Sequence, residues 1–184
     1  MKVWNLIGLI VVSFLTIGCS DNDTKLAQGW HFQGRDCLAC HNVDLGDDKN
    51  LLMGGTIYKS STVTDTDDMN QVCGGNFIIN FLNSTSGSVV LSSEYNADLD
   101  SAGYQGKGNI FILKKQGLSL NGSYKIQILD SDSNELIKSD FTHSFNSNDY
   151  DITNSQDYSN SISCNACHNI GNINPISVNA TYCE

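Results

Sequence analysis

Short apolar runs separated by polar turns dominate the middle of the chain. One run alternates apolar and polar residues over 124–128, as a strand with one buried face does. No long stretch has the 3.6-residue periodicity of an amphipathic helix. The pattern predicts a mainly β fold, an antiparallel β-sandwich with strands at 56–58, 76–82, 89–91, 109–113, 124–129, 136–137 and 141–145.

The amino terminus has a different pattern, that of an export signal. Lys2 precedes an apolar run over 6–17, and Gly18 stands directly before Cys19. The run is shorter than the roughly 20 residues that a permanent membrane-spanning helix needs. We therefore expect residues 1–18 to be a signal peptide; the alternatives to the lipidation considered next are an ordinary cleavage and an uncleaved anchor.

Residues 15–19, with the sequence Leu-Thr-Ile-Gly-Cys, resemble a bacterial lipobox, although Thr16 stands where such boxes usually carry Leu. The resemblance implies that Cys19 is lipidated and becomes the first residue of the mature protein. In such lipoproteins a residue other than Asp after the cysteine, here Ser20, favours the outer membrane. The expected location is the cell envelope, as an outer-membrane lipoprotein that faces the periplasm or the cell surface.

Composition narrows the class of protein further. The 184 residues include 20 acidic and 10 basic side chains, for a net charge of −10, and 21 Asn. The length suits one compact domain with attachments, and the polar uncharged excess suits an exported, turn-rich protein. Nucleic acid is excluded as an expected partner because an acidic chain repels phosphate.

Two copies of the pattern C-x-x-C-H are the strongest chemical signal in the chain. One copy comprises Cys37, Cys40 and His41, and the other comprises Cys164, Cys167 and His168. This is the attachment sequence of c-type haem. The two thiols reach the two vinyl groups of one porphyrin edge, and the adjacent imidazole turns under the ring to bind the iron. The second imidazole nitrogen is normally held by a backbone carbonyl.

Two structural alternatives use the same cysteines, namely paired disulfides and a four-cysteine zinc site. Export weakens both, since haem is attached outside the cytoplasm, and neither explains a His directly after each pair. On residues 37–41 and 164–168 together with the export segment, the chain resembles the dihaem c-type cytochromes of bacterial envelopes. The resemblance implies two covalently attached haems, one at each end of a β domain.

The expected organisation follows from these segments: 1–18 signal peptide, 19–53 tether and first haem-binding segment, 54–150 β-sandwich, and 151–184 second haem-binding segment with a C-terminal tail. The β-sandwich is thus flanked by two short haem-binding segments.

The remaining histidines match the number of remaining axial positions. With His41 and His168 as proximal iron ligands, His31 and His143 are the candidate distal ligands. Alternation along a strand would place His143 on one face with Phe141 and Phe145. Met53 is the alternative distal ligand, and the choice matters because a thioether ligand raises the reduction potential. For each His, partial burial without a metal is the structural alternative, and for Met53 it is a place in the core.

Two cysteines remain, Cys73 and Cys183. In an oxidising envelope they are expected to pair and to tie the C-terminal tail to the start of a strand, with two separate thiols as the alternative.

Electron transfer is the expected function. Its alternatives are a haem enzyme or ligand sensor with one open axial site, and a surface binding module without haem. Expected partners are redox proteins with basic surface patches, the membrane through the lipid anchor, and other copies of the chain if the haems lie at opposite poles and form chains. Haems at the same pole would instead make a compact two-electron unit.

Overall fold

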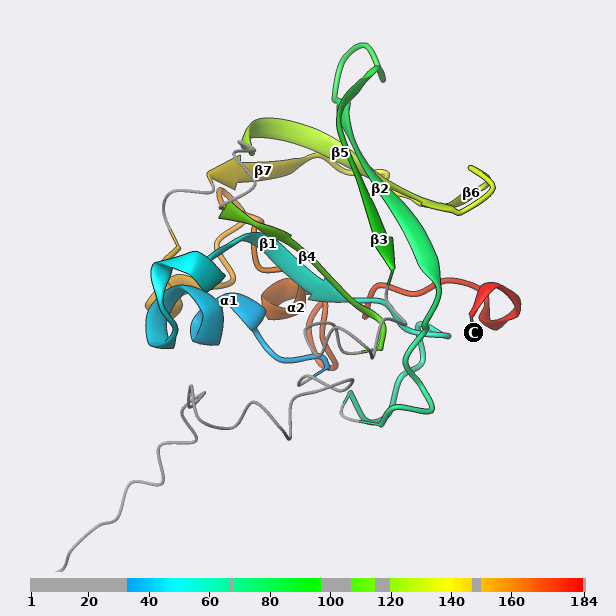
Figure 1. Ribbon diagram of the computed structural model, residues 1–184, viewed down its shortest axis with the longest axis horizontal. Coiled ribbons are helices and arrows are strands. Elements are labelled where there is room, and N and C mark those ends of the chain that lie inside the picture. The colour runs from blue at the N-terminus through cyan, green and yellow to red at the C-terminus, as the bar shows by residue number, and fades with distance from the viewer. Residues whose placement is uncertain (1–32, 67, 97–106, 115–119, 147–149, 184) are drawn as a thin grey trace, which may run out of the picture.

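Two antiparallel sheets form the body of the chain in the computed structural model, which describes residues 33–66, 68–96, 107–114, 120–146 and 150–183 (Figure 1). The smaller sheet pairs β1 (Leu51–Thr56) with β4 (Asn109–Leu113). The larger one has the order β3-β2-β5-β6, with β7 also paired to β5. Its strands are β2 (Asn76–Asn83), β3 (Val89–Asn96), β5 (Asn121–Asp130), β6 (Glu135–Lys138) and β7 (His143–Asn146). The mainly β, sandwich-like fold expected from the apolar runs is confirmed.

All described helices are short. They are α1 (Cys37–Ala39), η1 (Cys40–Asp44), η2 (Asp47–Lys49), η4 (Ile152–Asn154), α2 (Cys164–Cys167) and η5 (Ala180–Tyr182). In the described part of the chain, no helix has the length and apolarity needed to cross a membrane.

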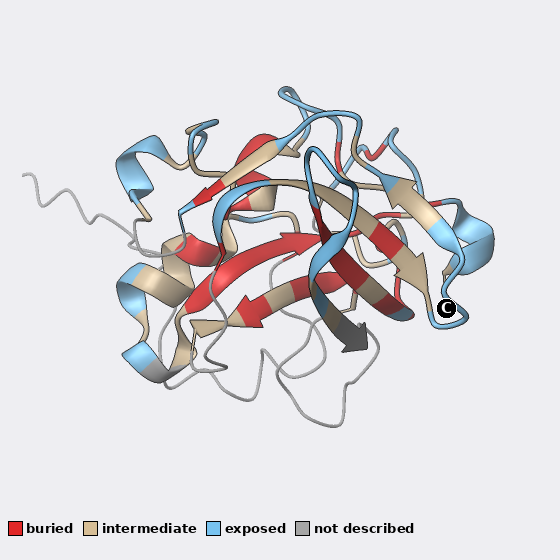
Figure 2. Ribbon diagram, turned by 90° about the horizontal axis from the view of Figure 1, so that it is seen from above, coloured by how far each residue is buried: buried red, intermediate tan, exposed pale blue. Residues whose placement is uncertain are grey.

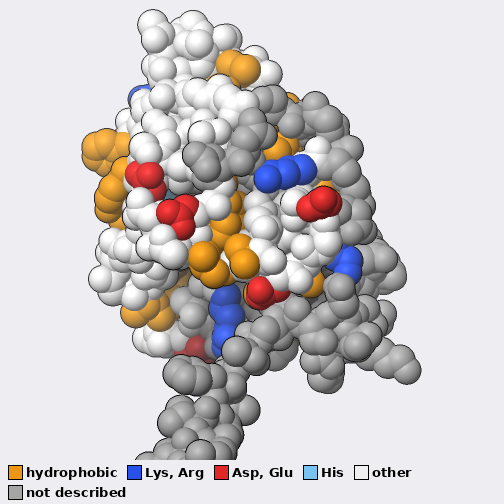
Figure 3. Space-filling model, turned by 90° about the vertical axis from the view of Figure 1, so that its left-hand side faces the viewer, with side chains coloured by type: hydrophobic (Ala, Val, Ile, Leu, Met, Phe, Trp, Pro, Cys, Tyr) orange, Lys and Arg blue, Asp and Glu red, His pale blue; other side chains and the backbone are white. Residues whose placement is uncertain are grey.

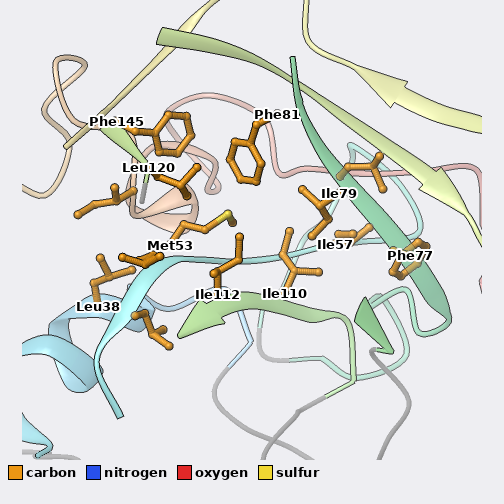
Figure 4. Packing of buried hydrophobic residues seen from close by; sticks show 14 of the residues in the cluster. Leu38, Met53, Ile57, Phe77, Ile79, Phe81, Ile110, Ile112, Leu120 and Phe145 are labelled. Atoms are coloured by element: carbon orange, nitrogen blue, oxygen red, sulfur yellow. The ribbon is translucent and has the colours of Figure 1, made fainter. Parts of the chain in front are cut away.

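The hydrophobic core lies between the two sheets (Figures 2 and 4). Phe81 of β2 is fully buried and makes edge-to-face contact with Phe145 of β7, with ring centroids 5.6 Å apart. From the smaller sheet, Ile110 and Ile112 of β4 point toward the same layer (Figure 4). Burying each side chain of this kind contributes roughly 1.5–3 kcal/mol to folding, so the interior holds the two sheets together.

The first strand differs from the prediction. The sequence predicts a strand at 56–58, but β1 begins at Leu51, ends at Thr56 and contains Gly54 and Gly55. It also crosses the expected boundary between residues 53 and 54. Tyr58 forms only isolated bridges, with Val72 and Ser177. The prediction failed because glycine is usually unfavourable inside a strand unless something approaches its backbone closely.

The last strand also differs in part. His143 and Phe145 both lie in β7, and Phe145 is buried as expected. Phe141 does not join them: the chain bends at this position, before β7 begins, and Phe141 is 82% exposed. The expectation that all three share one face is therefore wrong, because the alternation of a strand does not extend through the bend.

The predicted disulfide between Cys73 and Cys183 is confirmed. The two Cα atoms are 4.9 Å apart although the residues are 110 positions apart in the sequence. Cys73 precedes β2, and Cys183 belongs to the C-terminal tail. That tail also pairs with the backbone of Tyr58, which donates to Ile176 and accepts from Val178.

Candidate functional site

The two C-x-x-C-H motifs pack against the same strand. Both α1, which carries Cys37, and α2, which carries Cys164, contact β1. Figure 1 shows α1 and α2 at one side of the molecule, beside β1. Motifs far apart in the sequence therefore form one site instead of lying at opposite poles of the β domain.

The two glycines of β1 make this approach sterically feasible. A Cβ atom on Gly54 would lie 2.9 Å from the Cβ of Cys37, and one on Gly55 would lie 2.6 Å from the Cβ of Cys164. Successive residues of a strand point to opposite faces. The first cysteines of the two motifs therefore press against opposite faces of β1 at adjacent positions.

Asn165 joins the second motif to β1 and to the first motif. It is 2% exposed. Its Oδ1 accepts from the backbone N–H of Thr56 at 2.9 Å, and its Nδ2 donates to the carbonyl oxygen of Arg35 at 2.8 Å and to Oγ1 of Thr56 at 3.0 Å. The same Nδ2 lies 3.8 Å from Sγ of Cys37. Sequence reasoning treated Asn165 only as a spacer between two cysteines, because its partners come from distant segments.

Asp36 is a second link between the motifs. Its Oδ1 accepts from the backbone N–H of Leu38 at 3.1 Å, which caps α1, and from the hydroxyl of Ser163 at 2.5 Å. Its Oδ2 accepts from the hydroxyl of Tyr150 at 2.7 Å. Asp36 and Ser163 directly precede Cys37 and Cys164. An Asp before a short helical turn is a capping signal that could have identified Asp36, but not its other two partners.

The two motif histidines are held in the same way. Nδ1 of His41 lies 2.9 Å from the carbonyl oxygen of Lys49, and Nδ1 of His168 lies 3.0 Å from that of Asn174. A carbonyl only accepts, so Nδ1 carries the proton in each ring and the lone pair belongs to Nε2. This is the backbone-carbonyl contact that the sequence analysis expected. Burial lowers the pKa of His41, which favours the neutral imidazole that binds metals.

His143 lies beside the second motif histidine. The ring centroids of His143 and His168 are 6.2 Å apart and the ring planes are inclined by 30°. Nδ1 of His143 is buried and makes no hydrogen bond of good geometry among the described residues, although the backbone of Phe141 is near enough to the ring to favour its protonated form. Burial and the adjacent His168 lower the pKa of His143. The structure thus brings together one of the two candidate distal histidines and one proximal histidine.

The spacing of these rings suits a shared metal. A metal between two imidazoles holds their centroids about 6 Å apart, because each metal–nitrogen bond is about 2 Å long and each ring adds about 1 Å. A buried polar atom without a protein partner is costly unless a ligand or water satisfies it. The centroid separation of His143 and His168 is therefore compatible with an iron that has both as ligands.

The remaining candidate distal ligands are Met53 and His31, of which only Met53 lies among the described residues. Met53 is 3% exposed and belongs to the core, where Figure 4 shows it near Leu120. This placement favours the packing interpretation of Met53. His31 and Cys19 lie outside the described residues, as does the expected signal peptide.

The motif thiols are in two states. Cys37, Cys164 and Cys167 are free, whereas Cys40 is in a disulfide. Burial raises the pKa of Cys37 and of Cys164 to about 12, with smaller contributions from neighbouring thiols and from Asp36. Burial also raises the pKa of Cys167. These thiols are therefore protonated at neutral pH. A thioether at Cys40 would require its disulfide to be reduced first.

Neither a pair of disulfides nor a four-cysteine metal site involving all the motif cysteines is assembled among the described residues, although Cys40 is disulfide-bonded. The three free cysteines form no disulfide, and no three His, Cys, Asp or Glu side chains of the described segments come together as a metal site. An iron held by a porphyrin requires only one or two protein ligands.

Apolar side chains are exposed next to both motifs. Val43 and Ile170 occupy the same position, two residues after the motif histidine, and are 51% and 49% exposed. Figure 3 shows exposed hydrophobic side chains among polar ones on the side of the molecule where α1 lies. Such side chains suit contact with the flat apolar faces of a porphyrin.

No family model, no curated protein and no solved structure matches this chain.

Proposed function

We propose that this protein is a dihaem c-type cytochrome that transfers single electrons in the bacterial cell envelope. The observation that carries the proposal is the matched pair of hydrogen bonds from Nδ1 of His41 and of His168 to backbone carbonyls. Two motifs far apart in the sequence have no reason to share this detail unless both histidines serve one purpose. In both histidines the carbonyl would hold the imidazole so that Nε2 is free to bind a metal.

Each haem would be held by residues that the chain already groups together. Cys37 and Cys40 would form thioethers at the first site, and Cys164 and Cys167 at the second. When bound, each haem supplies an iron that cycles between the ferric and ferrous states. The protein contributes the axial imidazoles, the apolar side chains that cover the ring and the surrounding charges.

The geometry of His143 and His168 supports a ligand assignment at the second iron. We assign His168 as the proximal ligand and His143 as the distal ligand of the second iron. At the first iron, His41 is the proximal ligand, and His31 is the candidate for the distal position, with Met53 as the alternative. Two histidine ligands give a lower potential than a His and Met pair, so the protein would be a low-potential carrier.

The packing of both motifs on β1 supports a compact two-electron unit. Cys37 and Cys164 press against opposite faces of one strand, and Asn165 reaches from one motif to the other. This arrangement argues against a β domain that acts as a spacer between distant haems, and so against head-to-tail haem chains.

The partners and location stay as the sequence predicts them. We propose export, lipidation of Cys19 and tethering to the outer membrane, with a basic redox protein as partner. The net charge of −10, to which haem propionates would add, suits weak and salt-sensitive association with such a protein.

Haem staining after denaturing electrophoresis tests the proposal. The protein is produced with its signal peptide in a bacterium that matures c-type cytochromes, and intact mass is measured alongside. We expect two covalent haems in the natural chain and one in each of the variants Cys37→Ser with Cys40→Ser and Cys164→Ser with Cys167→Ser. The matched control is Cys73→Ser with Cys183→Ser, which removes two cysteines outside the motifs and should keep both haems. A natural chain without covalent haem would refute the proposal and favour a binding module.

A further inference from the structure

We propose that Asp36 is a shared electrostatic element of both haem sites, and that its carboxylate lowers the reduction potentials of both irons. The inference rests on the proposed function, since it concerns haems at both motifs. Asp36 directly precedes Cys37. It also accepts a hydrogen bond from the hydroxyl of Ser163, which directly precedes Cys164. It therefore touches the start of each motif.

The carboxylate is held in place by three donors on three segments. The backbone N–H of Leu38 and the hydroxyl of Ser163 donate to Oδ1, and the hydroxyl of Tyr150 donates to Oδ2. Burial and the contact with Asp36 raise the pKa of Tyr150, so this hydroxyl keeps its proton and remains a donor at neutral pH. A carboxylate fixed in this way keeps a constant distance to both motifs.

The charge of Asp36 reaches thiols of both motifs. It contributes, less than burial does, to the raised pKa of Cys37 in the first motif and of Cys164 in the second. A thiolate is disfavoured near a negative charge, and a ferric iron, which carries one more positive charge than a ferrous iron, is favoured there. The negative charge of Asp36, which is a minor cause of these shifts beside burial, would therefore also stabilise the oxidised state of both irons.

The direction of the effect separates an electrostatic role from a structural one. Each iron takes up one electron, supplied in the experiment by an electrode, and passes from ferric to ferrous. Asp36→Asn removes the negative charge and should raise both potentials. Tyr150→Phe leaves the charge but removes a donor that partly neutralises it, and should lower both potentials. A loss of packing would shift both variants in the same direction.

Potentiometric titration of the haem-loaded protein, with haem content and visible spectra measured alongside, provides the test. For Asp36→Asn we expect the ferrous-to-ferric ratio of both haems to rise about tenfold at a fixed potential, equivalent to about 59 mV for one electron. Asp132→Asn is the matched control, since it removes the same charge from an exposed position in the β5–β6 turn. It should leave both potentials nearly unchanged.

Three results would overturn the inference while leaving the cytochrome assignment intact. They are two attached haems with unchanged potentials in Asp36→Asn, a shift at only one haem, and shifts of the same sign in Asp36→Asn and Tyr150→Phe. If Asp36→Asn takes up no haem, Tyr150→Phe provides the test alone: lower reduction potentials support the electrostatic role of Asp36, and unchanged or higher potentials overturn it. Absence of haem from the natural chain would instead refute the proposed function itself.

Discussion

The imidazole rings of His143 and His168 lie 6.2 Å apart, centroid to centroid, although one belongs to β7 and the other follows α2. This spacing suits a six-coordinate iron between them. We therefore predict that the ferrous natural protein does not bind carbon monoxide at the second haem, because both axial positions are filled.

Replacing His143 tests this relationship directly. His143→Ala should open one axial position, so that one equivalent of carbon monoxide binds and the spectrum of one haem changes. Phe141→Ala, which alters an exposed neighbour, is the control and should bind none at this haem. Carbon monoxide binding by the natural protein at the second haem would contradict the ligand assignment and favour a sensor or enzyme.

The glycine pair of β1 predicts two site-specific defects. In Gly54→Ala the new methyl group meets Cys37, and in Gly55→Ala it meets Cys164. Overpacking of this kind typically costs about 1–3 kcal/mol. We expect denaturant midpoints to fall in both variants, with haem loss at the first site for Gly54→Ala and at the second for Gly55→Ala. Each variant is the control for the other. If either variant lost haem equally at both sites, the prediction that each glycine affects only its own haem site would be wrong.

Asn165 should contribute strongly to stability. Replacement by Ala leaves the backbone N–H of Thr56 without the acceptor Oδ1, and it removes the donor Nδ2 from the carbonyl of Arg35 and from Oγ1 of Thr56. Each unsatisfied buried group costs about 1–3 kcal/mol, so we expect a loss of about 2–4 kcal/mol in the free energy of unfolding, measured by chemical denaturation. Asn172→Ala, at an exposed position, is the matched control. Similar losses in both variants would contradict the anchoring role of Asn165.

The disulfide between Cys73 and Cys183 should stabilise the protein without serving the haem chemistry. It closes a loop of 110 positions, and removing such a crosslink typically costs about 2–5 kcal/mol. In the haem-loaded protein, where Cys40 would be in a thioether, we expect the double Ser variant to unfold at lower denaturant, and reductant to lower the midpoint of the natural protein but not of the variant. A natural protein insensitive to reductant would show that the disulfide contributes little.

Thiol reactivity in the haem-free protein should depend on pH in a defined way. Because the pKa of Cys37 and of Cys164 is raised to about 12, only a small thiolate fraction exists at pH 8. Iodoacetamide should label these residues slowly there, and the rate should rise about tenfold per pH unit through pH 10. The denatured chain is the control, and its rate should level off above about pH 9.

The raised pKa values of Cys37 and Cys164 should also make the folded protein less stable at alkaline pH. A thiol whose pKa is higher in the folded state favours folding below its unfolded value, and this contribution is lost as pH rises from about 9 toward 12. Denaturation midpoints should therefore fall over this interval. A midpoint that is constant from pH 9 upward would contradict the burial of these thiols.

Most of the strands were predictable because strand patterns depend on local sequence, and the prediction of haem chemistry at the motifs also comes from local sequence. The alternation over 124–128 identifies β5, and the spacing of Cys37, Cys40 and His41 is itself the chemical signal. The pairing of Cys73 with Cys183 followed from compartment and elimination, and the structure confirms it.

Only the tertiary structure decided how these parts combine. It shows that both motifs share β1, that Asp36 and Asn165 join them, that Met53 lies in the core and that Phe141 points to solvent. Contacts of this kind join residues more than 100 positions apart, and their energy depends on packing that no local pattern encodes. The sequence by itself therefore determined which residues could hold two haems, whereas the fold decided that their sites meet at one strand.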